Sequence, residues 1–166
     1  SWITIVVILL LVIAYFGVGA VAANKLTIPK RRFPTEKSPA TFDLVYEDVR
    51  FPARGGDADI AAWYIPNQGS HQAVIIVHGN NESRTYEFSG NMVDLGAALQ
   101  QAGFNILMID LRGHGQSGDG RASFGINERR DILGAVDWLL DKGYQPGSIG
   151  VLGTSLGGAS SIGAGM

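Results

Sequence analysis

The chain has 166 residues and a formal net charge of −2, so it has the size of one ordinary domain and no electrostatic case for binding nucleic acid. It contains no cysteine, which excludes disulfides and thiolate metal sites. Glycine is abundant, at 23 of 166 residues, and from Gly79 onward it lies between apolar runs, as it does at turns between strands and helices.

The first 24 residues carry no charged side chain and are rich in Ile, Val, Leu and Ala. As a helix, residues 2–23 would reach roughly 33 Å, enough to cross a bilayer core of about 30 Å. This predicts a transmembrane helix over residues 1–24 and a single-pass membrane protein. A signal peptide is the alternative, because Ala20-Val21-Ala22 resembles a cleavage site, but the apolar stretch is longer than the usual ~7–15 residues.

Residues 25–40 read as a basic, proline-containing linker, and Pro29, Pro34 and Pro39 forbid a continuous helix. Its charged side chains are Lys25, Lys30, Arg31, Arg32, Lys37 and Glu36. We interpret this segment as a solvated spacer near anionic lipid headgroups. The excess of positive charge beside the apolar helix predicts that the globular part, residues 41–166, is cytoplasmic.

The globular part begins with a predicted hairpin. Alternating apolar residues predict strands over residues 44–51 and 60–65, and Arg54-Gly55-Gly56-Asp57 between them is a turn signal. Wholly apolar runs then predict buried strands, and amphipathic periods predict helices between them. The predicted strands are 73–77, 104–111 and 148–153, and the predicted helices are 91–101 and 127–142. Asn127 is the expected N-cap of the second helix and Gly143 its stop.

Alternating strands and helices predict a mostly parallel sheet covered by helices on both faces. In such sheets ligands bind beyond the carboxyl ends of the strands. Three glycine-bearing stretches, residues 78–81, 112–118 and 153–158, each follow the end of a predicted strand. We therefore expect all three to meet at one edge of the sheet.

The third stretch contains the spacing G-x-S-x-G, with Ser155 between Gly153 and Gly157. This spacing is typical of a nucleophile elbow, a sharp turn from a strand into a helix that exposes a serine hydroxyl. Such a turn strains the serine backbone and crowds the positions two residues before and after it, so both must be glycine.

With these motifs the chain resembles the α/β-hydrolases. The resemblance rests on His78-Gly79-Asn80, on Asp110-Leu111-Arg112-Gly113-His114-Gly115-Gln116-Ser117 and on the run from Gly153 to Gly158, in the order that this fold uses. It covers residues 41–166 and is nearest to membrane-anchored, serine-aminopeptidase-like hydrolases. It implies an α/β-hydrolase fold preceded by one transmembrane helix.

The resemblance also implies a chemistry. Ser155 would be the nucleophile, and the backbone N–H groups of Leu156 and Asn80 would be the oxyanion donors. The reaction would be acyl transfer to serine and then hydrolysis of an ester, thioester or peptide bond in a small-molecule, lipid or peptide substrate, without a cofactor.

The other motif residues would support these loops. They are His78, Gly79, Asp110, Arg112, Gly113, His114, Gly115, Gly153 and Gly157. His78 and His114 would organise their own loops, while His71 is expected to be solvated. Asp110 would hold its loop, and Arg112 is expected to be its neighbour or a surface charge.

A serine nucleophile also needs a histidine and an acid, which in this fold follow the serine in sequence. No histidine or acid follows Ser155. We therefore expect the sequence to be the N-terminal portion of the enzyme, truncated after the elbow strand, inert alone, and with that strand exposed along one edge.

Two other functions remain open. One is a membrane-tethered, non-catalytic binding module that keeps the hydrolase-like loops. The other is a dinucleotide-binding oxidoreductase, because the stretch from Gly113 to Gly118 matches G-x-G-x-x-G. That function needs a helix that opens at the motif, whereas here the loop continues to about Asn127. No zinc-protease or P-loop motif occurs, so we expect no metal or phosphate site.

Overall fold

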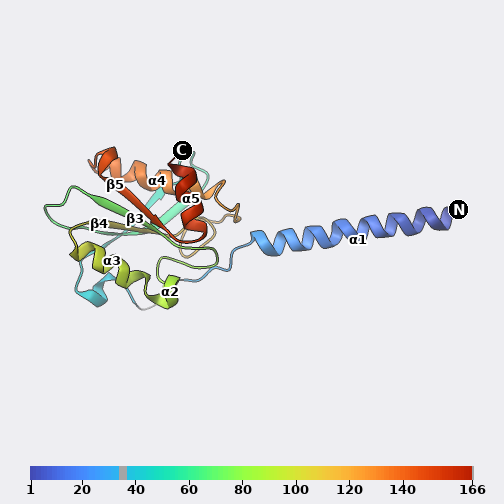
Figure 1. Cartoon of the computed structure of the whole chain (residues 1–166), viewed down its shortest axis with the longest axis horizontal. Helices are drawn as coiled ribbons and strands as arrows, with labels where there is room; N and C mark the ends of the chain where they lie inside the picture. The colour runs from blue at the N-terminus through green and yellow to red at the C-terminus, as the bar shows by residue number, and fades with distance from the viewer. Residues whose placement is uncertain (34–36, 166) are drawn as a thin grey trace.

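A computed structural model describes residues 1–33 and 37–165 of the chain. Pro34 and Glu36 of the predicted linker therefore lie outside the described residues, as does Met166 at the end of the chain. Figure 1 shows a long helix, α1 (Trp2–Thr27), that leads away from a layered α/β body. No residue of α1 is buried, and by length and composition alone α1 is able to cross a membrane.

The body is built on a five-stranded sheet with the order β1-β2-β4-β3-β5. Its strands are β1 (Glu47–Pro52), β2 (Asp59–Ile65), β3 (Ala73–Val77), β4 (Asn105–Ile109) and β5 (Ile149–Gly153). β1 and β2 form the predicted antiparallel hairpin, and β2 is also antiparallel to β4. β4, β3 and β5 are parallel, so the carboxyl ends of these three strands share one edge of the sheet.

Helices cover both faces of this sheet (Figure 1). The short α2 (Glu87–Gly90) and α3 (Met92–Gln101) lie on one face, and α4 (Glu128–Asp141) and α5 (Leu156–Ala164) lie on the other. β3 shows why its sequence is apolar throughout: Ile75 packs toward α4 and Ile76 toward α3, and both are buried. Burying one such side chain contributes about 1.5–3 kcal/mol.

Two local predictions need adjustment. The first strand begins at Glu47 rather than at residue 44, because the ladder with β2 starts at Glu47, while the half-buried Leu44 packs against the hydrophobic cluster that contains Trp63. Asn127 precedes α4, but its side chain makes no cap. The neighbouring Glu128 carboxylate accepts the N–H groups of Ser123 and Gly125 instead, at 2.7 and 2.8 Å, and thereby ties the preceding loop to the helix.

Other predictions agree with the structure. Gly143 follows α4 with a φ of 98°, the left-handed conformation expected of a helix stop. β5 forms one edge of the described sheet, and Val151 on it is exposed. Short 3₁₀ helices occur at Pro39–Phe42 and Pro146–Ser148.

Residues 28–32, which we call the strap, lie on the body rather than in solvent. The N–H of Lys30 donates to Asn81 Oδ1 at 2.7 Å. The Arg31 guanidinium donates to the carbonyl oxygens of Gly115 and Ser117 at 3.0 and 2.6 Å. The expectation of a solvated spacer is wrong for this part of the linker, because backbone carbonyls of the 112–119 loop hold its charge.

Candidate functional site

The turn at Ser155 joins β5 to α5 at the shared carboxyl edge of the parallel strands. Ser155 has a φ of 48° and a ψ of −112°, a sparsely populated conformation for a residue with a side chain, and Ser155 is exposed. The N–H of Thr154 donates to the carbonyl oxygen of Val77 at 3.1 Å, which ties the turn to the end of β3. The neighbouring structure therefore maintains a strained backbone at an accessible hydroxyl.

Backbone crowding explains the two glycines that flank this turn. A Cβ on Gly153 would lie 2.4 Å from the carbonyl oxygen of Gly157. A Cβ on Gly157 would lie 2.5 Å from the carbonyl oxygen of Val77 and 2.7 Å from that of His78. The crowding predicted between the two glycines is present, and β3 adds a second constraint that the spacing alone does not reveal.

The loop after β3 lies against Ser155. A Cβ on Gly79 would be only 3.3 Å from Ser155 Cβ, so the two backbones approach closely. Within the described residues, the amide N–H groups of Asn80 and Leu156 have no hydrogen-bond acceptor. Leu156 is also the first residue of α5, where the helix dipole favours negative charge.

Glu87 is a site residue that the sequence analysis missed. Its carboxylate accepts the N–H of Gly79, and it stands beside the loop that faces Ser155. The one-turn helix α2 that carries it is irregular, with positive φ values at Phe88 and Ser89. An acid eight residues after Gly79, in a segment without helical periodicity, gives no sequence signal of this contact.

His78 and His114 lie side by side, with ring centroids 5.0 Å apart, and both are fully buried. His78 Nε2 accepts the N–H of Leu111 at 3.1 Å, and His114 Nε2 accepts the N–H of Asn81 at 3.1 Å. Each Nδ1 lies within hydrogen-bond distance of a backbone carbonyl oxygen, that of Gly79 or that of Arg112. Both rings are therefore neutral, with the proton on Nδ1.

Burial lowers the pKa of both histidines. Desolvation is the main cause for each, and it brings the pKa of His114 to about 4. A ring whose Nε2 already accepts a backbone N–H has no free lone pair with which to take a proton from Ser155. Among the described residues, these two rings connect the 78–81 loop to the 111–114 loop and do not face Ser155 as a base.

We expect the lowered pKa of His114 to make the folded state sensitive to acid. The unfolded ring takes up a proton near pH 6.5 and the folded ring only near pH 4, so the unfolded state binds more protons between these values. The free energy of unfolding should fall by about 1.6 kcal/mol from pH 6.5 to pH 5 for this group. Urea unfolding in detergent, followed by tryptophan fluorescence, should show a smaller fall for His114→Asn; equal falls would contradict the assignment.

Asp110 is buried and holds its loop through three hydrogen bonds. It accepts the N–H of Arg84 at 2.8 Å, the Arg84 Nη1 at 3.0 Å and the N–H of Gln116 at 2.9 Å. A Cβ on Gly115, where φ is 45°, would lie 2.1 Å from the Asp110 carboxylate. Arg84, a fully buried arginine stacked 4.5 Å above the Trp63 ring, was not anticipated from the sequence.

Arg112 is neither a surface charge nor the partner of Asp110. Its guanidinium is buried and binds two other carboxylates, Asp131 on α4 at 2.7 Å and Asp57 at 2.8 Å. The prediction for Arg112 is wrong because both partners lie far away in sequence. Arg112 joins the loop after β4 to α4 and to the β1–β2 hairpin turn.

The Gly113 to Gly118 stretch is a closed turn. The N–H of Gly113 donates to the carbonyl oxygen of Gly118 at 2.8 Å, and the N–H of Gly118 donates to that of Asp59 at 2.7 Å. A Cβ on Gly113 would lie 2.4 Å from the carbonyl oxygen of Gly120. No helix opens at this stretch, since the next one is α4, so the geometry does not support a pyrophosphate site.

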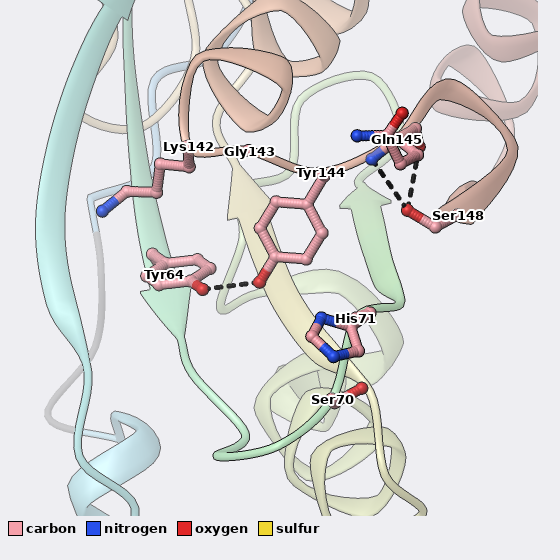
Figure 2. Close-up of a pocket in the computed structure, with 8 residues that line it drawn as sticks. All are labelled: Tyr64, Ser70, His71, Lys142, Gly143, Tyr144, Gln145 and Ser148. Carbon is pink, nitrogen blue, oxygen red and sulfur yellow. Dashed lines mark hydrogen bonds between the residues drawn. The ribbon is translucent and has the colours of Figure 1, made fainter.

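A pocket of about 600 Å³ lies elsewhere on the body and is not part of this site (Figure 2). The hydroxyl groups of Tyr64 and Tyr144 meet there at 2.7 Å, and the exposed His71 lies at its side. Desolvation raises the pKa of Tyr144. None of its lining residues belongs to the three predicted loops. Across the described residues, no three His, Asp or Glu side chains gather as a metal site.

Comparison with known proteins agrees with this geometry. The family described as "alpha/beta hydrolase fold" matches residues 72–161, more than half of the chain. The chain belongs to the alpha/beta hydrolase family. Esterase Pf2001 of Pyrococcus furiosus is 30% identical with a TM-score of 0.72, over 84% of this chain and 52% of that one. Hydrolase GrgF of Penicillium sp. sh18, 22% identical with a TM-score of 0.63, shares the fold over 73% of this chain and 41% of its own.

Curated relatives of this alpha/beta hydrolase include two uncharacterized proteins. YqkD of Bacillus subtilis is 30% identical over 106 residues, which cover 63% of this chain and 32% of YqkD. Rv2307c of Mycobacterium tuberculosis is 30% identical over 128 residues, which cover 75% of this chain and 41% of Rv2307c. The chain thus spans less than half the length of these relatives.

Proposed function

We propose that the protein is a serine hydrolase that forms an acyl-enzyme at Ser155 and releases it with water. The observation that carries this proposal is the strained, exposed turn at Ser155 between β5 and α5. A strain of this kind costs about 1–3 kcal/mol and persists only where the surrounding structure enforces it. A nucleophile elbow accounts for this strain, because the sharp turn from strand to helix exposes the serine hydroxyl to a substrate.

The proposed oxyanion hole consists of the backbone N–H groups of Leu156 and Asn80. Both lack an acceptor within the described chain, and both adjoin residues that contact each other, Ser155 and Gly79. These two N–H groups would donate hydrogen bonds to the carbonyl oxygen of the substrate as negative charge develops on it. One such donor contributes about 2.7–4 kcal/mol to transition-state stabilisation in related chemistry.

The proton of Ser155 needs an acceptor that the described residues do not offer. His78 and His114 are engaged through Nε2, and His71 lies in the pocket of Figure 2. In this fold the acid and the histidine follow the serine in sequence. We therefore propose that turnover requires an acid and a histidine in addition to the described residues, which provide the nucleophile and the oxyanion donors.

An ester is the first substrate class to examine, ahead of a thioester or a peptide. Support comes from esterase Pf2001, which is similar over most of this chain. We further propose that α1 anchors the protein in a membrane and that the basic residues after it keep the body on the cytoplasmic side.

Hydrolysis assays on the full-length protein test the proposal. We expect p-nitrophenyl esters to be cleaved faster than the matching anilides, because the ester leaving group needs less protonation. The rival is a binding module that keeps the loops without turnover. Absence of hydrolysis of esters, thioesters and anilides by folded full-length protein would favour that rival.

A further inference from the structure

The last turn of α1 touches the body directly. The carbonyl oxygen of Thr27 accepts the N–H of Ala122 at 2.7 Å, and Thr27 Oγ1 accepts from Arg121 Nη1 at 3.0 Å. Two residues later Pro29 packs against Gly113, since a Cβ on that glycine would lie 3.1 Å from Pro29 Cγ. No spacer therefore separates the end of the helix from the loop that contains residues 120–126.

The length of α1 sets the depth of this contact in a membrane. Residues 2–23 carry no charge, are mostly apolar and match a hydrocarbon core of about 30 Å. Residues 24–27 add one further turn of about 6 Å. The headgroup layer on each side of the core is about 5–7 Å thick. The bond between Thr27 and Ala122 therefore falls within the headgroup layer when α1 spans the bilayer.

The side chains beside the contact between Thr27 and Ala122 are of the kinds found in the headgroup layer. Phe124 is 60% exposed and Ile126 is 68% exposed, although both are large and apolar. Ile28 and Phe33, on and next to the strap, are exposed as well. Aromatic and aliphatic side chains next to basic ones are typical of segments that lie at a membrane surface. We call residues 120–126, together with Ile28 and Phe33, the exit face.

We propose that the exit face is seated in the headgroup layer of the bilayer, with Phe124 and Ile126 in contact with lipid. The strap holds the body in this orientation, because Arg31 binds two carbonyl oxygens of the 112–119 loop and also Asp119 at 2.9 Å. The exit face also borders the candidate site. A Cβ on Gly125 would lie 3.6 Å from the backbone of Ala159 on α5, one turn after Ser155. The proposal rests on α1 spanning the membrane and is independent of whether Ser155 is catalytic.

Val45 provides a matched control on the opposite side of the body. It is 79% exposed and precedes β1, whose first residue Glu47 pairs with Tyr64. β2 ends at Ile65, which pairs with Ile106 near the start of β4. Val45 therefore lies toward the amino ends of the parallel strands, away from the exit face.

These 166 residues contain no cysteine, so single labels report depth directly once any cysteine elsewhere in the full-length protein is replaced by serine. Phe124→Cys, Ile126→Cys and Val45→Cys are made in the full-length protein, labelled with a nitrobenzoxadiazole dye and reconstituted in phosphatidylcholine vesicles. We expect lipids spin-labelled near the headgroup to remove about half of the fluorescence at 124 and 126, and aqueous iodide to quench only the label at 45. The proposal is overturned if iodide quenches all three labels alike and the spin-labelled lipids quench none. The readout needs no catalysis, so a failed hydrolase assay leaves it unaffected.

Discussion

Replacing Ser155 with alanine should lower kcat for ester hydrolysis by the full-length protein at least about 10⁴-fold, because the nucleophile and its base act as one unit. The side chain at this position is exposed, so the substitution leaves the packing of the body unchanged. Steady-state kinetics with a p-nitrophenyl ester measures the loss. The residual rate would come from the oxyanion donors and from substrate binding, which remain in the variant.

Ser161→Ala is the matched control for this variant. Ser161 lies on α5, and its hydroxyl donates to the carbonyl oxygen of Gly157 at 2.6 Å, within the helix. We expect its kcat to stay within about threefold of the natural protein, since exposed or helix-internal hydroxyl bonds contribute little net energy. Equal activity of Ser155→Ala and Ser161→Ala would show that the reaction does not use Ser155.

Replacing Asp110 with alanine should lower the free energy of unfolding by about 3–5 kcal/mol, a large part of the total for one domain. The variant leaves the Arg84 guanidinium, only 1% exposed, without its buried carboxylate. It also removes the acceptor for the backbone N–H groups of Arg84 and Gln116. Urea unfolding in detergent, followed by tryptophan fluorescence, measures the loss.

Asp119→Ala is the control, because it removes an aspartate whose carboxylate is fully exposed while it pairs with Arg31. Surface ion pairs contribute little, so we expect no measurable change in unfolding. If Asp110→Ala were as mild as Asp119→Ala, the buried pair with Arg84 would not stabilise the loop after β4.

Most of the fold could be predicted from the local pattern of apolar and polar residues. The runs that became β3 and β4 are apolar because both faces of each strand are covered, and such runs can be recognised in the sequence without knowledge of the neighbouring strands. The turn at Ser155 was predictable for a similar reason, since Gly153 is required by crowding against Gly157, which lies only four residues away in the chain. The sheet order, in which β4 lies between β2 and β3, depends on packing over long distances in the chain and left no local pattern.

Contacts between distant segments explain what the sequence did not reveal. In the sequence, Arg84 has no feature that distinguishes it from an exposed loop arginine. In the structure it binds Asp110 and stacks on Trp63. Arg112 donates hydrogen bonds to Asp131, nineteen residues later in the chain. Arg31 of the strap donates to carbonyl oxygens more than eighty residues away. Charged residues are mostly exposed in folded proteins, so a sequence alone predicts that these side chains are solvated. Their burial or binding becomes visible only when the structure places their partners beside them.

The site of covalent modification tests the central claim most directly. The full-length protein is treated with a fluorophosphonate, digested and analysed by mass spectrometry, with Ser155→Ala treated in parallel. A serine activated as a nucleophile reacts with this probe, while ordinary surface hydroxyls do not. We predict a single adduct on the peptide that contains Ser155 and none on the variant. An unmodified Ser155 in folded full-length protein that still hydrolyses esters would contradict the account.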